Sequence, residues 1–187
     1  MPNVSHRWLF LVALLALVAC KKVLKPDELP ANIALGATYY TQFVIPYEKG
    51  TYLTSNFRRG ALIPVNTPVR LSAITTKTIE VELANGGQKL LVKNVEKHTG
   101  DDVYHAFDKL FAKQQVNLWN FSDLERQHIQ SGTVAVGMRK DAVKVAIGYP
   151  PATETMSLAS DVWMYWSGRF NKFKVTFANG MVSKIED

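Results

Sequence analysis

The stretch that decides the fold is VWMYWSGRFNKFKVTFANGMVSKI, residues 162–185. It contains three apolar runs separated by two turn signals, Ser167-Gly168 and Asn179-Gly180. An Asn-Gly pair between apolar runs is the strongest short-range sign of a β-hairpin. The middle run alternates apolar and polar residues from Lys172 to Phe177, as a half-buried strand does. The sequence therefore predicts a three-stranded antiparallel meander over residues 162–166, 172–177 and 182–185.

Two helices are predicted ahead of this meander. Ser122 and Glu125 have the spacing of a capping box, in which each side chain satisfies a backbone N–H of the other residue. Residues 138–147 form an apolar face at helical spacing, and Gly148 followed by Pro150 ends the helix. Helix, helix and meander in this order predict an α+β fold with the helices on one face of the sheet.

A further helix is predicted just after Gly100. Its apolar stripe at helical spacing consists of Val103, Phe107, Leu110 and Phe111. Asp101 and Asp102 stand at its start, where negative charge complements the helix dipole. We therefore predict that residues 98–187 form one unit, a helical connection followed by the α+β domain.

Residues 37–97 have the pattern of a β-rich module, which makes an N-terminal lobe. Ile79, Val81 and Leu83 alternate with polar residues, and Asn85-Gly86-Gly87 predicts a tight turn into the next strand. Short antiparallel strands with tight turns indicate a small sheet or an SH3-like barrel, because four or five strands do not fix closure.

An aromatic cluster opens this module and consists of Tyr39, Tyr40, Phe43, Tyr47 and Tyr52. We interpret it as the apolar side of a strand packed on a small core. The alternative is a ligand-stacking surface.

The first residues of the chain predict export. His6 and Arg7 precede an apolar run from Trp8 to Val18, which is shorter than the ~20 residues that a membrane-spanning helix needs. A positive start, a short apolar core and then small residues form the pattern of a secretory signal peptide.

The end of this leader, Leu17-Val18-Ala19-Cys20, resembles the lipobox of bacterial lipoproteins. Cys20 is the only cysteine, so the chain cannot form an internal disulfide. The resemblance implies that residues 1–19 are a lipoprotein signal peptide, cut between Ala19 and Cys20, and that the Cys20 sulfur carries lipid. The alternative is an ordinary signal peptide cut nearby or an uncleaved apolar anchor.

Residues 20–36 are predicted to be a tether, because they show no sustained helical or strand period and are interrupted by Pro26 and Pro30. In enterobacterial sorting, an aspartate directly after the cysteine retains a lipoprotein in the inner membrane. Lys21 holds that position here. By this resemblance we expect the outer membrane of a Gram-negative bacterium, on its periplasmic face.

The charge of the chain is moderately basic, with 22 Lys and Arg against 16 Asp and Glu. Lys21, Lys22 and Lys25 lie beside the predicted lipid, where each can gain up to ~1 kcal/mol near an anionic membrane surface. The other basic residues are scattered, so nucleic acid is not expected as a partner.

The C-terminal part of the chain carries a set of turn glycines and core residues: Gly132-Thr133-Val134, Gly137-Met138, Val143, Gly148-Tyr149-Pro150-Pro151, Trp163, Tyr165 and Phe177-Ala178-Asn179-Gly180-Met181-Val182. In these positions it resembles the SmpA/OmlA lipoprotein family. The family includes the small E subunit of the outer-membrane β-barrel assembly machinery, and a similar fold occurs in β-lactamase-inhibitor proteins. Two features depart from the family. Arg139 stands where a Ser or Thr usually caps the helix, and residues 37–95 have no counterpart.

No catalytic set, metal or cofactor is predicted, and we expect the protein not to be an enzyme. His98 and His105 lie near three aspartates, Asp101, Asp102 and Asp108. A weak metal site is the alternative there, but the spacing lacks a recognised ligand motif and a solvated face is expected. His128 is the third histidine beyond the leader.

Arg58-Arg59 is interpreted as a solvated turn. The alternative is a site for a phosphate or a lipid headgroup.

The aromatic run of the meander supplies the candidate partner-binding residues, which are Trp163, Tyr165 and Trp166. Strand geometry puts Trp163 and Tyr165 on one face, and Met164 and Trp166 on the other. If one face packs on the helices, the other is covered by the β module or binds a partner.

These features predict a membrane-anchored binding or scaffolding module for cell-envelope maintenance or assembly, with an envelope protein as its partner. The alternative is an envelope-stress or inhibitor-type protein that blocks a periplasmic enzyme.

Overall fold

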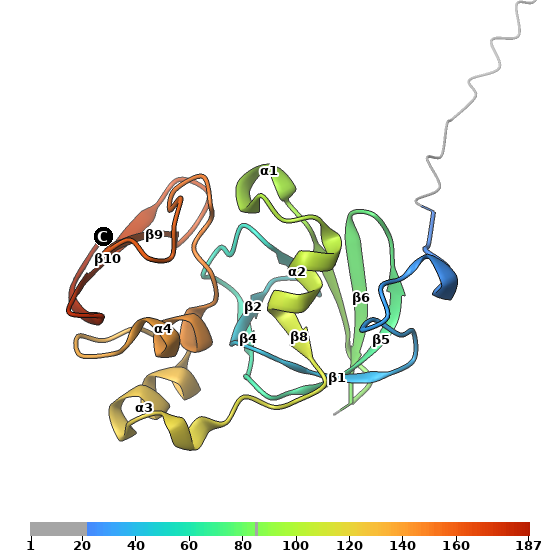
Figure 1. The fold of residues 1–187 in the computed structure, drawn as a ribbon, viewed down its shortest axis with the longest axis horizontal. Coiled ribbons are helices and arrows are strands. Elements are labelled where there is room, and N and C mark those ends of the chain that lie inside the picture. The colour runs from blue at the N-terminus through green and yellow to red at the C-terminus, as the bar shows by residue number, and fades with distance from the viewer. Residues whose placement is uncertain (1–21, 85) are drawn as a thin grey trace, which may run out of the picture.

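The computed structural model describes residues 22–84 and 86–187. Two lobes lie side by side along the long axis of the molecule, with the N-terminal β lobe at one end and the C-terminal lobe at the other (Figure 1). The mixed sheets and helices confirm the predicted α+β class.

The β lobe is built on a curled six-stranded sheet with the order β3-β7-β6-β5-β1-β8. Its strands are β1 (Thr38–Thr41), β3 (Thr51–Leu53), β5 (Pro68–Ile74), β6 (Thr78–Leu83), β7 (Lys89–Lys93) and β8 (Phe111–Ala112). A separate antiparallel pair is formed by β2 (Ile45–Tyr47) and β4 (Ala61–Ile63). The six-stranded sheet ends at β3 and β8 without pairing them, so it is an open curled sheet rather than a closed barrel.

Alternation explains how this sheet is buried. Val69, Leu71, Ile79 and Val81 point to one face and are almost fully buried, while Arg70, Ser72 and Glu80 between them are exposed. The aromatic cluster packs into the same core, since Tyr39, Phe43 and Tyr52 are each less than 5% exposed. The core interpretation of these three residues is therefore confirmed.

Helix α2 (Val103–Leu110) covers the inner face of the sheet, with the short helix α1 (Glu96–Thr99) before it (Figure 1). Asp102 caps α2, because its carboxylate accepts the backbone N–H groups of Tyr104 and His105. Phe107 packs edge-on to the Tyr39 ring at 4.9 Å. Helix α2 and strand β8 thus complete the β lobe, so the division between the lobes follows Ala112 rather than residue 97.

The segment predicted as a tether is folded onto the β lobe wherever the structure describes it. Val23 pairs with Thr75, and the backbone N–H of Leu24 donates to the carbonyl of Ile74 at 2.8 Å. Leu24 and Ile33 are buried in the β-lobe core, on either side of a 3-10 turn (Pro26–Glu28). The segment shows no period because it is held by separate apolar side chains, with Leu29 and Leu35 also packed against this core, and by backbone hydrogen bonds to β5.

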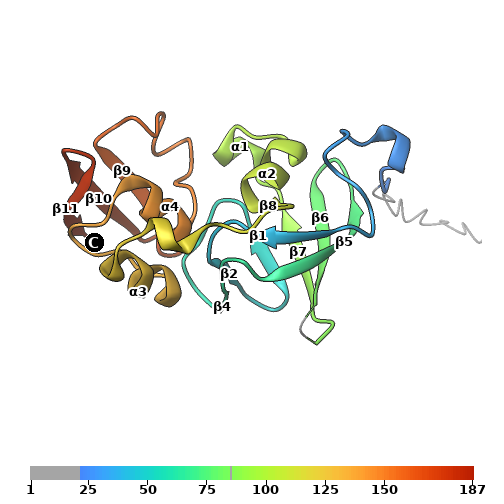
Figure 2. The same ribbon diagram turned by 60° about the horizontal axis from the view of Figure 1, so that its bottom comes forward.

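The C-terminal lobe has the predicted helix-helix-meander order. Helices α3 (Asp123–Ser131) and α4 (Lys140–Ile147) follow a 3-10 turn (Leu118–Asn120), and the sheet order is β11-β10-β9. The strands are β9 (Val162–Trp166), β10 (Lys172–Ala178) and β11 (Met181–Glu186). Both helices lie on the same side of this small sheet (Figure 2). Ser122 and Glu125 form the predicted capping box, and Gly148 ends α4.

Candidate functional site

The junction between the lobes is held by the segment 54–60 and by Val44. The backbone N–H of Val44 donates to the carbonyl of Val145 in α4 at 3.1 Å, and the Val44 side chain is buried in the C-terminal core. Asn56 is 1% exposed, and its amide donates to the carbonyls of Ile147 at 2.7 Å and Tyr149 at 3.0 Å. These contacts join residues about ninety positions apart in sequence.

Asn56 has a positive φ of 58°, a conformation that asparagine tolerates better than most residues. The backbone therefore turns at Asn56 and brings the next two side chains, Phe57 and Arg58, to the C-terminal lobe.

Arg58 is not a solvated residue and does not face outward for an anion. Its guanidinium donates to three backbone carbonyls, those of Val44 at 3.2 Å, Gly132 at 3.1 Å and Ile147 at 3.4 Å. Gly132 and Ile147 stand at the ends of α3 and α4, where unpaired carbonyls make the helix ends negative. Burial lowers the pKa of Arg58, but arginine stays protonated under ordinary conditions. Both interpretations of Arg58 from the sequence are corrected: it is a structural cation at two helix ends.

Arg59 behaves differently from its neighbour. It is exposed and forms an ion pair with Glu48 at 2.8 Å. The expected solvated turn is therefore confirmed for Arg59 alone.

Two of the three candidate partner-binding residues lie in the interior. Trp163 and Tyr165 are 0% exposed, and the Tyr165 hydroxyl donates to the carbonyl of Gly148 at 3.0 Å. Burial raises the pKa of Tyr165 well above its ordinary value, so it remains a neutral phenol. Because their strand face packs on α4, Trp163 and Tyr165 are removed from the candidate partner surface in this conformation.

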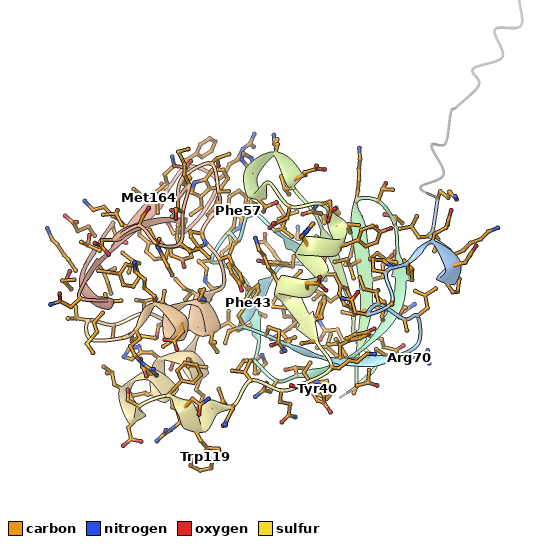
Figure 3. All side chains as sticks on the ribbon, in the orientation of Figure 1. Tyr40, Phe43, Phe57, Arg70, Trp119 and Met164 are labelled. Carbon is orange, nitrogen blue, oxygen red and sulfur yellow. The ribbon has the colours of Figure 1, made fainter. Side chains whose placement is uncertain are left out.

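Trp166, the third candidate, is half-buried at the junction. Its ring stacks on Phe57 with centroids 5.2 Å apart, and the His98 ring meets it edge-on at 4.8 Å. Phe57 lies between the two lobes, whereas Met164, which is in β9 like Trp166, lies farther from the β lobe (Figure 3). The outward face of β9 is thus partly covered by the β lobe, which was one of the two predicted arrangements.

This aromatic contact contains two unpaired nitrogens. The Nε1 atom of Trp166 and the Nδ1 atom of His98 are buried without a hydrogen-bond partner among the described residues. An unpaired buried polar group costs about 1–3 kcal/mol. The Phe57–Trp166–His98 contact therefore holds the lobes together less firmly than its aromatic area suggests.

A cavity of about 160 Å³ lies between the β lobe and the loop that follows α4. Its apolar lining consists of Phe43, Tyr52, Ala106, Leu110, Tyr149, Pro150, Ala152, Met156 and Leu158. Its polar lining consists of Thr54, Thr99, Asp101, Lys109 and Thr155. Both lobes contribute, so the cavity exists only when the junction is formed. Met156 is 96% exposed, which leaves a flexible apolar side chain beside the cavity.

The charges in this cavity neutralise each other. Lys109 forms an ion pair with Asp101 at 2.5 Å, and its ammonium lies 5.1 Å from the centre of the Tyr149 ring. Burial raises the pKa of Tyr52 and of Tyr149, so neither phenol serves as a base near neutral pH. The lining suits an apolar or aromatic group rather than acid–base chemistry.

The histidines and aspartates that were considered as a weak metal site make separate contacts and do not converge. His98 packs on Trp166, while His105 pairs with Asp102 at 2.9 Å on the exposed side of α2. Asp108 accepts a hydrogen bond from Asn32. No group of three or more possible metal ligands forms among residues 22–84 and 86–187.

Ala19 and Cys20, the predicted cleavage and lipidation residues, lie outside the described part of the chain. Within the described part, no helix is long and apolar enough to cross a membrane. Comparison with protein-family models, with curated proteins and with solved structures finds no match to this chain. The SmpA/OmlA resemblance therefore stays a prediction.

Sequence reasoning missed Asn56 and the true environment of Arg58. The one available signal was Asn56-Phe57-Arg58 between two predicted strands. An asparagine in this position indicates a turn, but it does not show which residues the turn contacts.

Proposed function

We propose that this protein is a lipid-anchored binding module of the cell envelope, tethered through Cys20 to the periplasmic face of the outer membrane, and not an enzyme. The observation that carries the proposal is the run Leu17-Val18-Ala19-Cys20 directly after a short apolar leader. Acylation would also protect the only thiol of the chain in an oxidising compartment.

The junction supports the binding part of the proposal. A cavity lined by two lobes, with apolar walls and one internal ion pair, is suited to hold an apolar side chain or group from a partner. The partner proposed is an envelope protein that inserts such a group beside Met156 and Leu158. Met156 is suited to this contact because its unbranched side chain adapts to different shapes.

Mass spectrometry of the membrane-bound protein tests the anchor. Wild-type protein and Cys20→Ser are compared after the inner and outer membranes have been separated. The expected result is an N-terminus at acylated Cys20 in the outer-membrane fraction, and loss of acylation and of membrane attachment in Cys20→Ser. An uncut or unacylated wild-type chain would overturn the proposal.

Site-specific crosslinking tests the binding part. A photoreactive amino acid replaces Met156 at the cavity, and in a second variant it replaces Ala178, which is exposed at the end of β10. The expected result is an envelope protein captured from position 156 in cells and not from position 178. Equal capture from both positions, or none from position 156, would contradict a partner at the cavity.

A further inference from the structure

We infer that the end of the β lobe bearing the β5–β6 turn lies directly against the anionic headgroups of the membrane, so that the C-terminal lobe points away from the bilayer. This inference rests on the proposed lipidation of Cys20. It deepens that proposal by naming the membrane-contacting surface, its partner chemistry and the orientation that follows.

The chain between the anchor and the folded body is short. Only Lys21 and Lys22 separate Cys20 from Val23, which already pairs with Thr75. Three residue steps span at most about 10 Å when fully extended. The headgroup layer of one leaflet is roughly 5–8 Å thick, so this span leaves almost no slack beyond the headgroups.

The folded body cannot move away from the membrane by unravelling its N-terminal segment at little cost. The Leu24 side chain is 8% exposed and belongs to the β-lobe core, and its backbone N–H donates to Ile74. Burying a leucine side chain is worth about 1.5–3 kcal/mol, which the chain would lose if it lengthened the tether by peeling off the sheet. The β lobe is therefore held against the surface rather than suspended from it.

The surface that this attachment brings to the membrane carries several lysines. Lys77 stands in the β5–β6 turn, and its carbonyl accepts the N–H of Asn94, the residue after Lys93 in β7. Lys22 and Lys25 lie on the N-terminal segment beside this turn, and all four lysines are exposed.

The acidic residues on this N-terminal segment or bonded to it are Asp27, Glu28 and Asp108; Glu28 is paired with Lys22 at 2.5 Å, and Asp108 accepts a hydrogen bond from Asn32. The four lysines exceed these three carboxylates by one, so the net charge of these seven residues is positive and matches anionic headgroups, to which each lysine near the surface can contribute about 1 kcal/mol.

The attachment also sets the direction in which the C-terminal lobe extends. The N-terminal segment and the C-terminal lobe lie at opposite ends of the long axis in both views (Figures 1 and 2). With the β lobe on the membrane, the interlobe cavity and the C-terminal sheet extend into the aqueous space. A partner that approaches from the periplasm can then reach Met156 without passing the membrane.

Fluorescence quenching on vesicles tests the inference. Because acylation blocks the only native thiol, single cysteines can be introduced at the exposed positions Thr76 in the β5–β6 turn and Ala178 in the C-terminal lobe, as Thr76→Cys and Ala178→Cys. Each acylated full-length variant is labelled and placed in phosphatidylethanolamine–phosphatidylglycerol vesicles whose headgroups carry a nitroxide. We expect quenching several-fold stronger at position 76 than at position 178.

Two matched controls separate the tether from the charge. A Gly-Ser insertion between Lys22 and Val23 is expected to reduce quenching at position 76, because the lobe can then leave the surface. Lys25→Glu with Lys77→Glu is expected to reduce it as well, whereas Lys172→Glu with Lys184→Glu, on the C-terminal sheet, is not.

The outcomes distinguish this inference from the proposed function. Acylated protein that floats with vesicles but is quenched equally at both positions overturns the orientation and leaves the lipid anchor intact. Protein that mass spectrometry shows to be unacylated overturns both. The anionic headgroup is overturned as the ligand if quenching at position 76 is the same on phosphatidylcholine vesicles and is also unchanged in the variant that carries Lys25→Glu and Lys77→Glu.

Discussion

The guanidinium of Arg139 and the carboxylate of Glu125 form a two-point ion pair, with Nε to Oε1 and Nη2 to Oε2 each at 2.9 Å. The same carboxylate accepts the backbone N–H groups of Arg139 and of Ser122, both at 2.9 Å. Ser122 and Arg139 are the residues that precede α3 and α4, so one carboxylate fixes the starts of both helices. Arg139 therefore does not cap α4 as a Ser or Thr would, but ties its start to α3.

Replacement of Glu125 by glutamine is expected to lower the free energy of unfolding by about 1–3 kcal/mol. The amide keeps the shape of the side chain but loses the charge that faces Arg139, and it has only one acceptor oxygen. Urea denaturation measures the change. Glu48→Gln, which breaks the exposed pair with Arg59, is the matched control and is expected to change it by less than about 1 kcal/mol. Equal effects from both variants would show that the Glu125 pair is no stronger than a surface pair.

The stability of the protein is expected to fall as the pH drops from about 4.5 toward 2. The hydrogen bonds from Arg139 hold the pKa of Glu125 at about 2, below the ordinary value of 4.5. A carboxyl with a lowered pKa in the folded state stabilises the fold above its unfolded pKa, and this contribution is lost as the group is protonated. Arg139 is 42% exposed, so solvent screens the pair and we expect a loss of about 1–2 kcal/mol. Denaturation midpoints of wild type and Glu125→Gln that run parallel across this range would contradict the assignment.

The neighbouring arginines Arg58 and Arg59 are expected to differ sharply on replacement by methionine. Arg58→Met leaves the carbonyls of Val44 and Gly132 without the Arg58 donor and leaves Ile147 with the Asn56 amide alone, so it should destabilise the protein by about 2–3 kcal/mol. Arg59→Met removes only an exposed ion pair and should change the free energy of unfolding by less than about 1 kcal/mol. Thermal unfolding of the two variants measures this contrast. A larger loss from Arg59→Met would refute the structural role of Arg58.

Gly148→Ala is expected to disrupt the junction. A methyl group there would lie 2.7 Å from the Phe43 ring, and the φ of Gly148 is +75°. Clash and backbone strain together should destabilise the fold by about 3–5 kcal/mol. Gly36→Ala has nearly the same φ of +77° but meets no atom within 4 Å, so it measures the cost of a positive φ without a clash, at about 1–2 kcal/mol. Similar losses from both variants, measured by urea denaturation, would mean that contact with Phe43 is unimportant.

Several elements of the C-terminal lobe could be predicted because their signals are short. Asn179-Gly180 turns between β10 and β11, and Ser122 bonds Glu125 only three residues away. The helix after Gly100 was also predicted, but its predicted apolar stripe included Phe111, which lies one residue beyond the end of α2. Phe111 instead begins β8 and pairs with Thr41 of β1, because the backbone of β1 is available there for strand pairing.

The candidate site was much less predictable. Alternation correctly separated the Trp163 face of β9 from the Trp166 face, but only packing showed which face α4 buries and which one Phe57 covers. The cavity could not be predicted at all, since its lining comes from four separate stretches of the chain.

The sequence by itself determined the α+β class, the meander and the capping box, because each depends on interactions or periods within a few residues. Only the tertiary structure decided that residues 22–36 belong to the β lobe, that Arg58 holds two helix ends, and that Glu125 joins α3 to α4. The physical reason is the same in each case. The groups that Arg58 and Glu125 bond across the fold lie from 14 to 89 residues away along the chain. The type of a side chain does not show which of these distant groups folding will bring within hydrogen-bond distance.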